Sequence, residues 1–417
     1  MRIAVLGAGI VGVTTAWYLA RDGHSVTIYD RRDRVAAETS HANAGLVAPG
    51  HAYAWASPRA PGMLLRSFWQ NDTALKLKLR ADPALFAWGL EFLRNCSAER
   101  NRRNTLIKLR LCLLSHASLN EIAAADEIAY HRVPKGLLYL YRDAAHLASG
   151  RANMAMLVEN GAALTSIDTD ECLAIEPALS PARDRIAGAI YAPSEESGDC
   201  RLFTENLSKK LAARGVQFEF GTAIRRLRRE GDRIAAVETE VGSIDADLFV
   251  LALGPYAAAV ARSVGVKLPV YPVKGYSLTV PLRDPSKAPM VGGVDEDRLV
   301  AFARMGDRLR LTSTAEISGY NLDHRPSDYA LMIETANELF PGAADFDRPD
   351  YWTCLRPMTP DGPPVLGPTP LKNLMLNAGS GHMGWTMACG NARIVADLIA
   401  KRTPPIPLDG LLLDNRS

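Results

Sequence analysis

The chain has 417 residues, of which 47% are hydrophobic and 23% charged, and it contains 32 glycines and 26 prolines. This composition indicates a folded globular protein of two or more domains and excludes disordered, collagen-like and coiled-coil proteins. The 48 Lys and Arg nearly balance the 46 Asp and Glu, so the net charge of +2 provides no overall field that would attract nucleic acid. The six cysteines contain no C-x-x-C pair, which favours reduced thiols and a cytoplasmic protein.

The N-terminus predicts a βαβ unit. Residues 2–6 are a continuous apolar run, typical of a strand buried on both faces of a parallel sheet. A helix is predicted over residues 10–22, ended by Gly23, and a second strand over residues 25–30. Between the first strand and the helix lies a G-x-G-x-x-G motif formed by Gly7, Gly9 and Gly12. Such glycines permit a tight turn, close approach of a pyrophosphate and close packing of helix on sheet, in that order.

The residues that follow the motif support a dinucleotide site. Ile10 and Val11 begin the helix, whose N-terminus would face the phosphates. Asp30 ends the second strand and would accept hydrogen bonds from the adenosine ribose hydroxyls, while Arg31 and Arg32 leave a 2′-phosphate as a minor alternative. The other interpretation of the motif is a tight turn that binds no ligand.

Two further segments favour an extended cofactor. Residues 38–46 form a small-residue loop without periodicity that could run along such a molecule, or could be an ordinary capping loop. Farther on we expect a helix over residues 201–214, strands over 216–220, 223–228 and 233–240, and a buried strand over 248–253 that leads into Gly254. Ala252 and Gly254 are expected to approach the cofactor.

The C-terminal part holds a second cluster. Residues 352–362 are interpreted as a turn-rich segment in which Arg356 lies among apolar residues and prolines, a setting suited to bidentate capture of a carboxylate. Pairing with a structural acid such as Asp361 is the alternative. A strand over residues 374–377, a glycine-rich loop over 378–384 and a helix over 385–401 follow. The start of this helix would stabilise negative charge on a reduced flavin ring.

These segments resemble the D-amino acid oxidase and glycine oxidase superfamily of FAD enzymes, and within it most closely the bacterial D-amino acid dehydrogenase small-subunit group. The resemblance covers the whole chain. It is carried by the segments GAGIVGVTTAWYLARDGHSVTIYDR, ETSHANAGLVAPG, SGDCRLFTENL, LRPMTPDG and GHMGWTMACG.

The resemblance implies an FAD site and a substrate site. Arg356 falls on the position that holds the substrate carboxylate, and Tyr276 is a weaker candidate for the substrate pocket. His382 is the obvious candidate for a base, but its position among glycines favours a role in the shape of the loop or in flavin contact. His41 and His51 are interpreted as ordinary polar loop residues, and no ligand cluster indicates a metal. The cofactor site is predicted to comprise Gly7, Gly9, Ile10, Val11, Gly12, Asp30, Arg31, Thr39, Ser40, Asn43, Ala44, Gly45, Leu46, Ile224, Ala252, Gly254, Gly379, Gly381, His382, Met383, Gly384, Trp385 and Thr386.

The implied activity is oxidative deamination of D-amino acids to 2-oxo acids and ammonia, with hydride transfer to the flavin and electrons passed to a quinone or another respiratory acceptor. A D-hydroxyproline or other secondary-amine dehydrogenase is a close alternative. An NAD-dependent dehydrogenase, or a flavoprotein that only binds or senses, would be a different class of protein.

Residues 59–110 contain 11 Lys and Arg against 4 Asp and Glu, a net charge of +7, interspersed with aromatic side chains. A basic helical face of this kind could contact an anionic bilayer, which predicts either a cytoplasmic protein or one peripheral to the cytoplasmic face of the inner membrane. The alternative is a solvated cationic face over a buried aromatic core.

The predicted fold is α/β, with a glutathione-reductase-like FAD-binding Rossmann domain and a discontinuous α+β substrate domain built on a mostly antiparallel sheet. The first domain is expected to collect residues 1–58, 145–262 and 352–417. The second collects residues 59–144 and 263–351, and strands over 276–280, 299–303 and 309–312 would cover the substrate.

Overall fold

The computed structural model describes residues 1–417 except 67–74, 79–80 and 416–417. Its first sheet has six strands, five of them parallel and the edge strand β19 antiparallel. The apolar run at the N-terminus forms the central strand β1, as expected for a strand buried on both faces. In spatial order the strands are β19 (Val365–Pro368), β20 (Leu374–Ala378), β13 (Leu248–Leu251), β1 (Arg2–Leu6), β2 (Ser25–Tyr29) and β9 (Gln217–Glu219).

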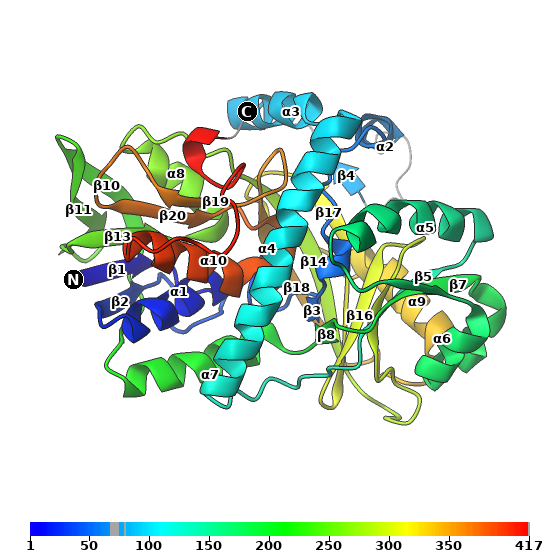
Figure 1. The fold of residues 1–417 in the computed structure, drawn as a ribbon. Coiled ribbons are helices and arrows are strands. Elements are labelled where there is room, and N and C mark those ends of the chain that lie inside the picture. The colour runs from blue at the N-terminus through cyan, green and yellow to red at the C-terminus, as the bar shows by residue number, and fades with distance from the viewer. Residues whose placement is uncertain (67–74, 79–80, 416–417) are drawn as a thin grey trace.

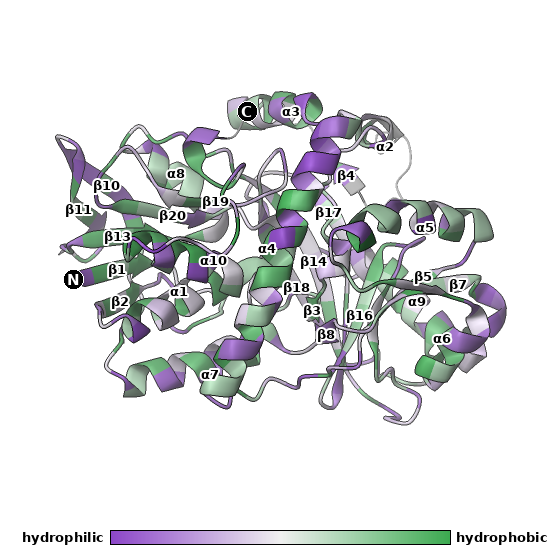
Figure 2. Cartoon of the chain, in the orientation of Figure 1, coloured by the Kyte–Doolittle hydropathy of each residue, from purple (hydrophilic) through white to green (hydrophobic). Residues whose placement is uncertain are grey.

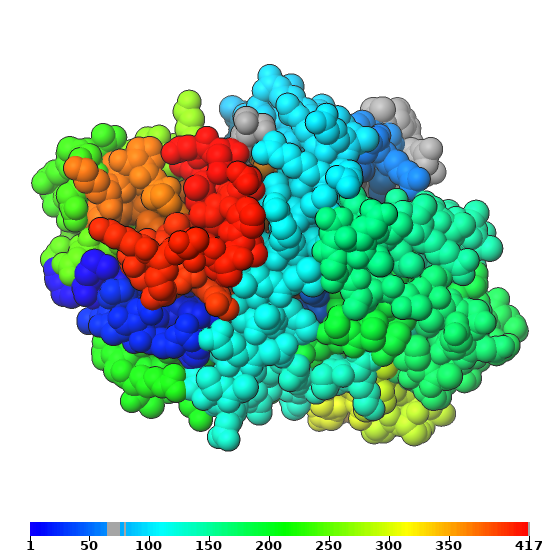
Figure 3. Space-filling model, viewed as in Figure 1, coloured from blue at the N-terminus to red at the C-terminus, as the bar shows by residue number. Residues whose placement is uncertain are grey.

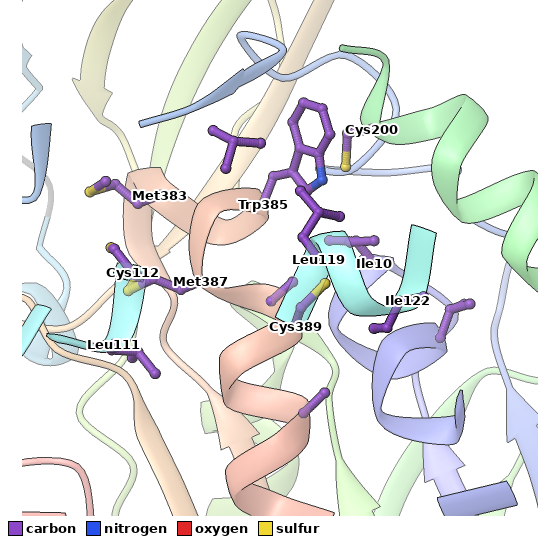
Figure 4. Packing of buried hydrophobic residues seen from close by; sticks show 14 of the residues in the cluster. Ile10, Leu111, Cys112, Leu119, Ile122, Cys200, Met383, Trp385, Met387 and Cys389 are labelled. Atoms are coloured by element: carbon purple, nitrogen blue, oxygen red, sulfur yellow. The ribbon is translucent and has the colours of Figure 1, made fainter. Parts of the chain in front are cut away.

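Helices cover one face of this sheet (Figure 1). They are α1 (Ile10–Arg21), α4 (Ala98–Ala125), α7 (Cys200–Ala213) and α10 (Gly384–Ile399). Figure 4 shows their shared core, where Trp385 and Cys389 of α10 lie beside Leu119 of α4 and Ile10 of α1. The helix α4 crosses the whole molecule and lies on its surface between the two halves (Figure 3).

The other face of the six-stranded sheet carries a small antiparallel sheet and a short helix. The sheet consists of β10 (Ile224–Glu230), β11 (Arg233–Thr239) and β12 (Ser243–Ile244), and the helix is α8 (Ala257–Arg262). Leu227, Val237 and Val260 pack with Phe249 of β13 in one buried cluster. Both faces of the parallel sheet are therefore covered, as such sheets require.

A second, nine-stranded sheet forms the other half of the molecule. Most of its neighbours pair antiparallel, while β15–β5 and β17–β4 pair parallel. Its strands are β18 (Asp350–Met358), β14 (Tyr271–Pro281), β17 (Arg308–Ile317), β16 (Val300–Met305), β15 (Gly292–Asp295), β5 (Leu137–Tyr141), β7 (Gly188–Ala192) and β6 (Thr165–Ile167), with β4 (Leu75–Leu77) paired to β17.

Helices and short segments complete the fold. The helix α9 (Ala330–Leu339) packs on the nine-stranded sheet, and Phe340, which follows it, contacts Phe302 with ring centroids 5.1 Å apart. A two-stranded sheet joins β3 (Leu46–Val47) to β8 (Glu196–Ser197). The other helices are α2 (Ala60–Arg66), α3 (Pro83–Arg94), α5 (Ala144–Glu159), α6 (Thr169–Ile175) and α9 (Ala330–Leu339), and the 3₁₀ turns are η1 (Pro49–His51), η2 (Pro177–Arg185), η3 (Gly254–Tyr256), η4 (Pro326–Tyr329), η5 (Gly381–Met383) and η6 (Leu413–Asn415).

One predicted segment is wrong in type. The sequence predicts a turn-rich segment over residues 352–362, but residues 350–358 form the strand β18, which pairs with β14 along nine residues. The prolines suggested turns because proline cannot donate to a sheet. The strand tolerates Pro357 because β18 is the edge of the sheet, where, among the described residues, β14 is its one partner strand and a single bridge joins Met358 to Ser380.

Sheet membership does not follow the predicted division of the chain. Strands β6 and β7 come from the 145–262 stretch and β18 from the 352–417 stretch, and all three belong to the nine-stranded sheet. Conversely, α4 comes from the 59–144 stretch and packs on α10. The division into two domains itself stays a prediction.

Candidate functional site

A cavity of about 760 Å³ lies between the six-stranded and nine-stranded sheets. Its wall contains every predicted site residue except Gly12, including both halves of the predicted cofactor site and the three catalytic candidates. The cavity is within the size range typical of cofactor and ligand sites. Residues from the N-terminal turn, the 38–46 loop and the start of α10 thus meet in one place although they are far apart in the sequence.

The three glycines of the N-terminal motif have different structural roles. Gly7 has a φ of +115°, and a Cβ there would lie 2.4 Å from the carbonyl oxygen of Ala252. A Cβ on Gly12 would lie 1.9 Å from the carbonyl oxygen of Gly7, so this glycine packs α1 against the turn, which explains why it is absent from the wall. A Cβ on Gly9 would meet only Ser40 Oγ, at 3.3 Å, and otherwise points into open space. Gly9 therefore leaves room for a ligand beside the turn that contains Gly7, Gly9 and Gly12, which we call the glycine cradle.

Asp30 directly follows β2 and lies on the cavity wall. Its carboxylate accepts the Ala8 N–H at 2.7 Å and the Arg32 N–H at 2.9 Å, one on each oxygen. Each carboxylate oxygen has a second lone pair, so both can also accept a hydroxyl. Arg31 and Arg32 both bind Glu38, at 2.5 and 2.7 Å. These arginines are thus already paired with a carboxylate, which favours ribose hydroxyls over a 2′-phosphate.

The 38–46 loop is held from both sheets. Ser40 Oγ accepts the Ile10 N–H at 3.0 Å, which ties the loop to the start of α1. From β17, Arg310 donates to the Asn43 carbonyl oxygen at 2.9 Å and to Thr279 Oγ1 at 2.5 Å. Arg310 is buried, and burial lowers its pKa to about 10. The sequence places Arg310 in a predicted strand but contains no signal for its contact with a loop far away in the chain.

The glycine-rich loop after β20 leads directly into α10. Gly379 and Gly381 have φ values of +77° and +58°, which favour glycine, and both line the cavity. The first turn of α10 contains no acidic residue, and its N-cap, Met383, supplies no side-chain cap. The helix N-terminus consequently presents a positive dipole end at the cavity wall, a setting that stabilises an anionic ring.

Arg356 extends from β18 into the cavity wall across the neighbouring strand. Its guanidinium lies against Gly275 of β14, where a Cβ would be 2.7 Å from Nε. Among the described residues, this guanidinium forms no ion pair, including none with Asp361, and no hydrogen bond. Burial lowers the pKa of Arg356, because the surroundings supply no compensating carboxylate. A cation in such surroundings is expected to bind an anionic group.

The other two catalytic candidates lie on the wall in different chemical states. The Tyr276 hydroxyl donates to Glu316 at 2.7 Å, so it is committed to a protein partner. His382 stacks on Trp55, with ring centroids 4.8 Å apart. Burial, followed by the positive charges of Lys108, His51 and Arg356, holds the pKa of His382 well below its usual value. His382 is therefore neutral at physiological pH.

The wall also contains residues that the sequence did not single out. They include Trp55, Trp88 and Phe92, which form an apolar stretch, and His51, which was interpreted as an ordinary loop residue. His41 does not line the cavity. An aromatic residue on the buried face of a helix has the same sequence pattern whether it lies in the core or on a cavity wall. The sequence therefore did not identify these wall residues.

Comparison with known proteins agrees with this geometry. Residues 2–398 match the family described as FAD dependent oxidoreductase. The chain is 46% identical over 413 residues to D-amino acid dehydrogenase 2 of Mesorhizobium japonicum, with 99% of each chain covered. It is 44% identical over 415 residues to the D-amino acid dehydrogenase of Paramagnetospirillum magneticum, covering 99% of this chain and 98% of the relative.

Among solved structures, glycine oxidase from Geobacillus kaustophilus has a TM-score of 0.77 at 21% identity, over 100% of this chain and 99% of that one. The shared architecture confirms the predicted α/β fold. The glycine cradle and the Asp30 carboxylate fit the ADP half of FAD, and the uncapped start of α10 fits its ring. The chain belongs to the FAD dependent oxidoreductase family.

Proposed function

We propose that this protein oxidises D-amino acids to 2-oxo acids and ammonia with FAD as the hydride acceptor. The observation that carries the proposal is Arg356, whose unpaired guanidinium lies on the wall of the same cavity as the glycine cradle. A substrate carboxylate would supply the missing partner, and bidentate pairing would fix its orientation. Similarity to two proteins named D-amino acid dehydrogenase over nearly the full length of each chain supports this substrate class.

Different parts of the cavity wall would hold different parts of FAD. Gly9, the start of α1 and Asp30 would hold the ADP half of FAD, and the loop from Thr39 to Leu46 would run beside the pyrophosphate and the ring. Ile224, Ala252 and Gly254, which also line the cavity, would contact the adenosine end, and residues 379–386 would contact the ring. Bound FAD supplies the hydride acceptor that no side chain can provide.

Within this arrangement Arg356 binds the substrate carboxylate and orients its Cα–H bond. His382 and Tyr276 shape the wall. The low pKa of His382 makes its imidazole a weak proton acceptor, and the Tyr276 hydroxyl is committed to Glu316. The apolar stretch around Trp88 excludes water from the reacting atoms.

Anaerobic titration tests this function. The purified protein is expected to show flavin absorption that is bleached by D-alanine but not by L-alanine, and D-proline and D-hydroxyproline are compared in the same way. Bleaching only by the cyclic amines would assign the protein to secondary-amine oxidation instead. Flavin absorption that none of these compounds bleaches would contradict the proposal. Readmitting air and then a quinone distinguishes oxygen from a respiratory acceptor.

We further propose that the physiological acceptor is a membrane quinone, reached by contact of α3 with an anionic bilayer surface. Three large apolar side chains, Phe86, Leu90 and Leu93, lie on the outer face of α3 and are 63%, 52% and 51% exposed. Their spacing places them on one side of the helix, opposite Leu85, Trp88 and Phe92, which are buried. Within the described residues, no helix combines the length and the apolar character needed to span a bilayer.

Charge around this apolar face favours anionic lipid. Arg100 and Arg102 are exposed near it, together with Glu99 and with Arg94, which is paired with Glu91. Figure 2 shows the end of α4 beside α3 as hydrophilic. The predicted basic stretch over residues 59–110 includes positions 67–74 and 79–80, which lie outside the described residues. Apolar side chains with arginines nearby are typical of helices that lie in a membrane interface.

Replacing Phe86, Leu90 and Leu93 together by serine is expected to remove binding to vesicles that contain phosphatidylglycerol, measured by sedimentation at low and high salt. Val241→Ser, which alters an apolar side chain 78% exposed elsewhere on the surface, is the matched control and is expected to bind like the unmodified protein. Equal binding of the triple variant, or equal binding to purely zwitterionic vesicles, would contradict the membrane contact.

A further inference from the structure

Two histidines lie on the cavity wall in opposite electrostatic settings. His382 is kept neutral, as described above. His51, at the end of η1, has Nε2 3.0 Å from Glu296 Oε1. Burial on its own would lower the pKa of His51, but the Glu296 carboxylate outweighs burial, and the net shift is upward. His51 is therefore the cavity histidine that can hold a proton near neutral pH.

The imidazole of His51 is held in place from two sides. Its ring stacks on Tyr139, with centroids 5.4 Å apart and an angle of 18° between the planes. The Tyr139 hydroxyl donates to Glu195 at 2.5 Å, and Glu195 also accepts the backbone N–H of Gly50, the residue before His51. Glu195 is buried, and burial raises its pKa to about 7. The carboxyl group thus fixes both the aromatic ring against His51 and the backbone that carries it.

Other charged groups also face His51. Lys108 of α4 is buried, and its Nζ donates to the Tyr53 carbonyl oxygen at 2.7 Å. Its positive charge opposes protonation of His51, whereas Glu195 favours it. The titratable groups that surround His51 are Glu296 after β15, Glu195 before β8, Tyr139 on β5, Tyr53 after η1, Lys108 on α4 and His382 in η5.

The pair extends from the cavity lining to a residue outside it. His51 lines the cavity and is 32% exposed, whereas Glu296 is not among the lining residues and is 16% exposed. His51 and Arg356 line the same cavity, and the positive charges of both lower the pKa of His382. A proton taken up by His51 would therefore lie on the wall of the cavity that holds Arg356, next to the Glu296 carboxylate.

We propose that the His51–Glu296 pair accepts the proton released by the substrate ammonium group and passes it to solvent. The inference rests on the proposed oxidation of D-amino acids. Formation of the imino acid breaks the Cα–H bond, whose electron pair leaves as hydride to FAD, and one N–H bond, whose proton must go to a base. With Nε2–H donating to Glu296, Nδ1 carries the lone pair that accepts this proton. Glu296 then stabilises the imidazolium and receives the Nε2 proton for release to water.

The test follows anaerobic flavin reduction by D-alanine as a function of pH. The unmodified protein is expected to lose rate below the pKa of His51, because protonated imidazole cannot accept a proton. His51→Gln should lose this acidic limb and react about 100- to about 10,000-fold more slowly, the range of a missing general base. Glu296→Gln should move the limb to lower pH, because loss of the carboxylate lowers the pKa of His51.

His146→Gln is the matched control. It removes another histidine paired with a carboxylate, Asp297 beside Glu296, but one that does not line the cavity. Its pH profile and rate should equal those of the unmodified protein. FAD content and circular dichroism of each variant establish that the fold is retained.

A second readout does not depend on turnover. In FAD-loaded protein labelled with ¹³C at histidine Cε1, one resonance absent from His51→Gln should titrate above the ordinary histidine pKa and shift to lower pH in Glu296→Gln. An unchanged pH profile in both variants would overturn the proton route while leaving the D-amino acid activity intact. Failure of any D-amino acid to reduce the unmodified protein would instead overturn the proposed function, with the resonance still reporting on the pair.

Discussion

Replacing Arg356 by methionine is expected to lower kcat/KM for D-alanine by about 30- to about 4000-fold while FAD remains bound. Methionine keeps an unbranched apolar stem but removes the only described wall cation that lacks a protein partner. Truncating one partner of a desolvated charge pair costs about 2–5 kcal/mol, which corresponds to this range. Steady-state kinetics together with the flavin absorption of the purified variant provide the measurement.

Arg356→Lys and Gly275→Ala refine this result. Lysine keeps the charge but loses the planar fork, so part of the activity should return. Alanine at position 275 keeps the guanidinium but would place a Cβ 2.7 Å from Nε, which forces Arg356 to move. We expect Gly275→Ala to raise KM by about tenfold, since a displacement that costs about 1.4 kcal/mol of binding has this effect. A change of less than threefold in kcat/KM for Arg356→Met would contradict the carboxylate role.

The N-terminal half of the site could be predicted from sequence because its determinants are local. The βαβ unit, its glycines and Asp30 lie within thirty residues, and the bounds of β1, α1 and β2 agree with the prediction to within about one residue. Each residue type there is required by backbone geometry that neighbouring residues define. The glycine-rich turn before α10 was predicted for the same reason.

Long-range packing accounts for what the sequence did not predict. Pro357 suggested a turn, because proline is rare inside strands. The structure places it in the edge strand β18, and the local sequence does not show which strands lie at the edge of a sheet. The contact of Arg310 with the Asn43 carbonyl joins residues 267 positions apart. His51 pairs with Glu296, which follows β15 and is far from it in the sequence. The residues next to His51 therefore do not distinguish it from any other loop histidine.

The domain prediction shows the same limit. Strands β6 and β7 contain apolar residues that suit either sheet, and only their pairing with β5 assigns them to the nine-stranded one. The helix α4 buries residues such as Leu119 and Ile122 against α10, although its sequence neighbours lie near the other half of the molecule. Periodicity predicts that an element has a buried face but does not identify its partner.

Replacing Gly9 by leucine is expected to weaken FAD binding by at least about 100-fold without destabilising the fold. Gly9 has a φ of −74°, which any residue can adopt, and its Cβ direction meets only Ser40 Oγ within 4 Å. The added side chain would therefore fill the cradle rather than strain the protein. Keeping the pyrophosphate away from the backbone removes charge-assisted hydrogen bonds of about 1.5–3 kcal/mol each, and losing two accounts for the expected effect.

Two comparisons separate loss of the ligand site from loss of the fold. Gly89→Leu makes the same change in α3, where a Cβ meets nothing within 4 Å, and should leave FAD affinity unchanged. Gly12→Leu should unfold the N-terminal turn, because its Cβ would lie 1.9 Å from the Gly7 carbonyl oxygen. Flavin fluorescence titration and thermal unfolding of the three variants give the measurement. If Gly9→Leu binds FAD normally, the pyrophosphate does not approach the backbone at this turn, and the ADP half of the cofactor must lie elsewhere in the cavity.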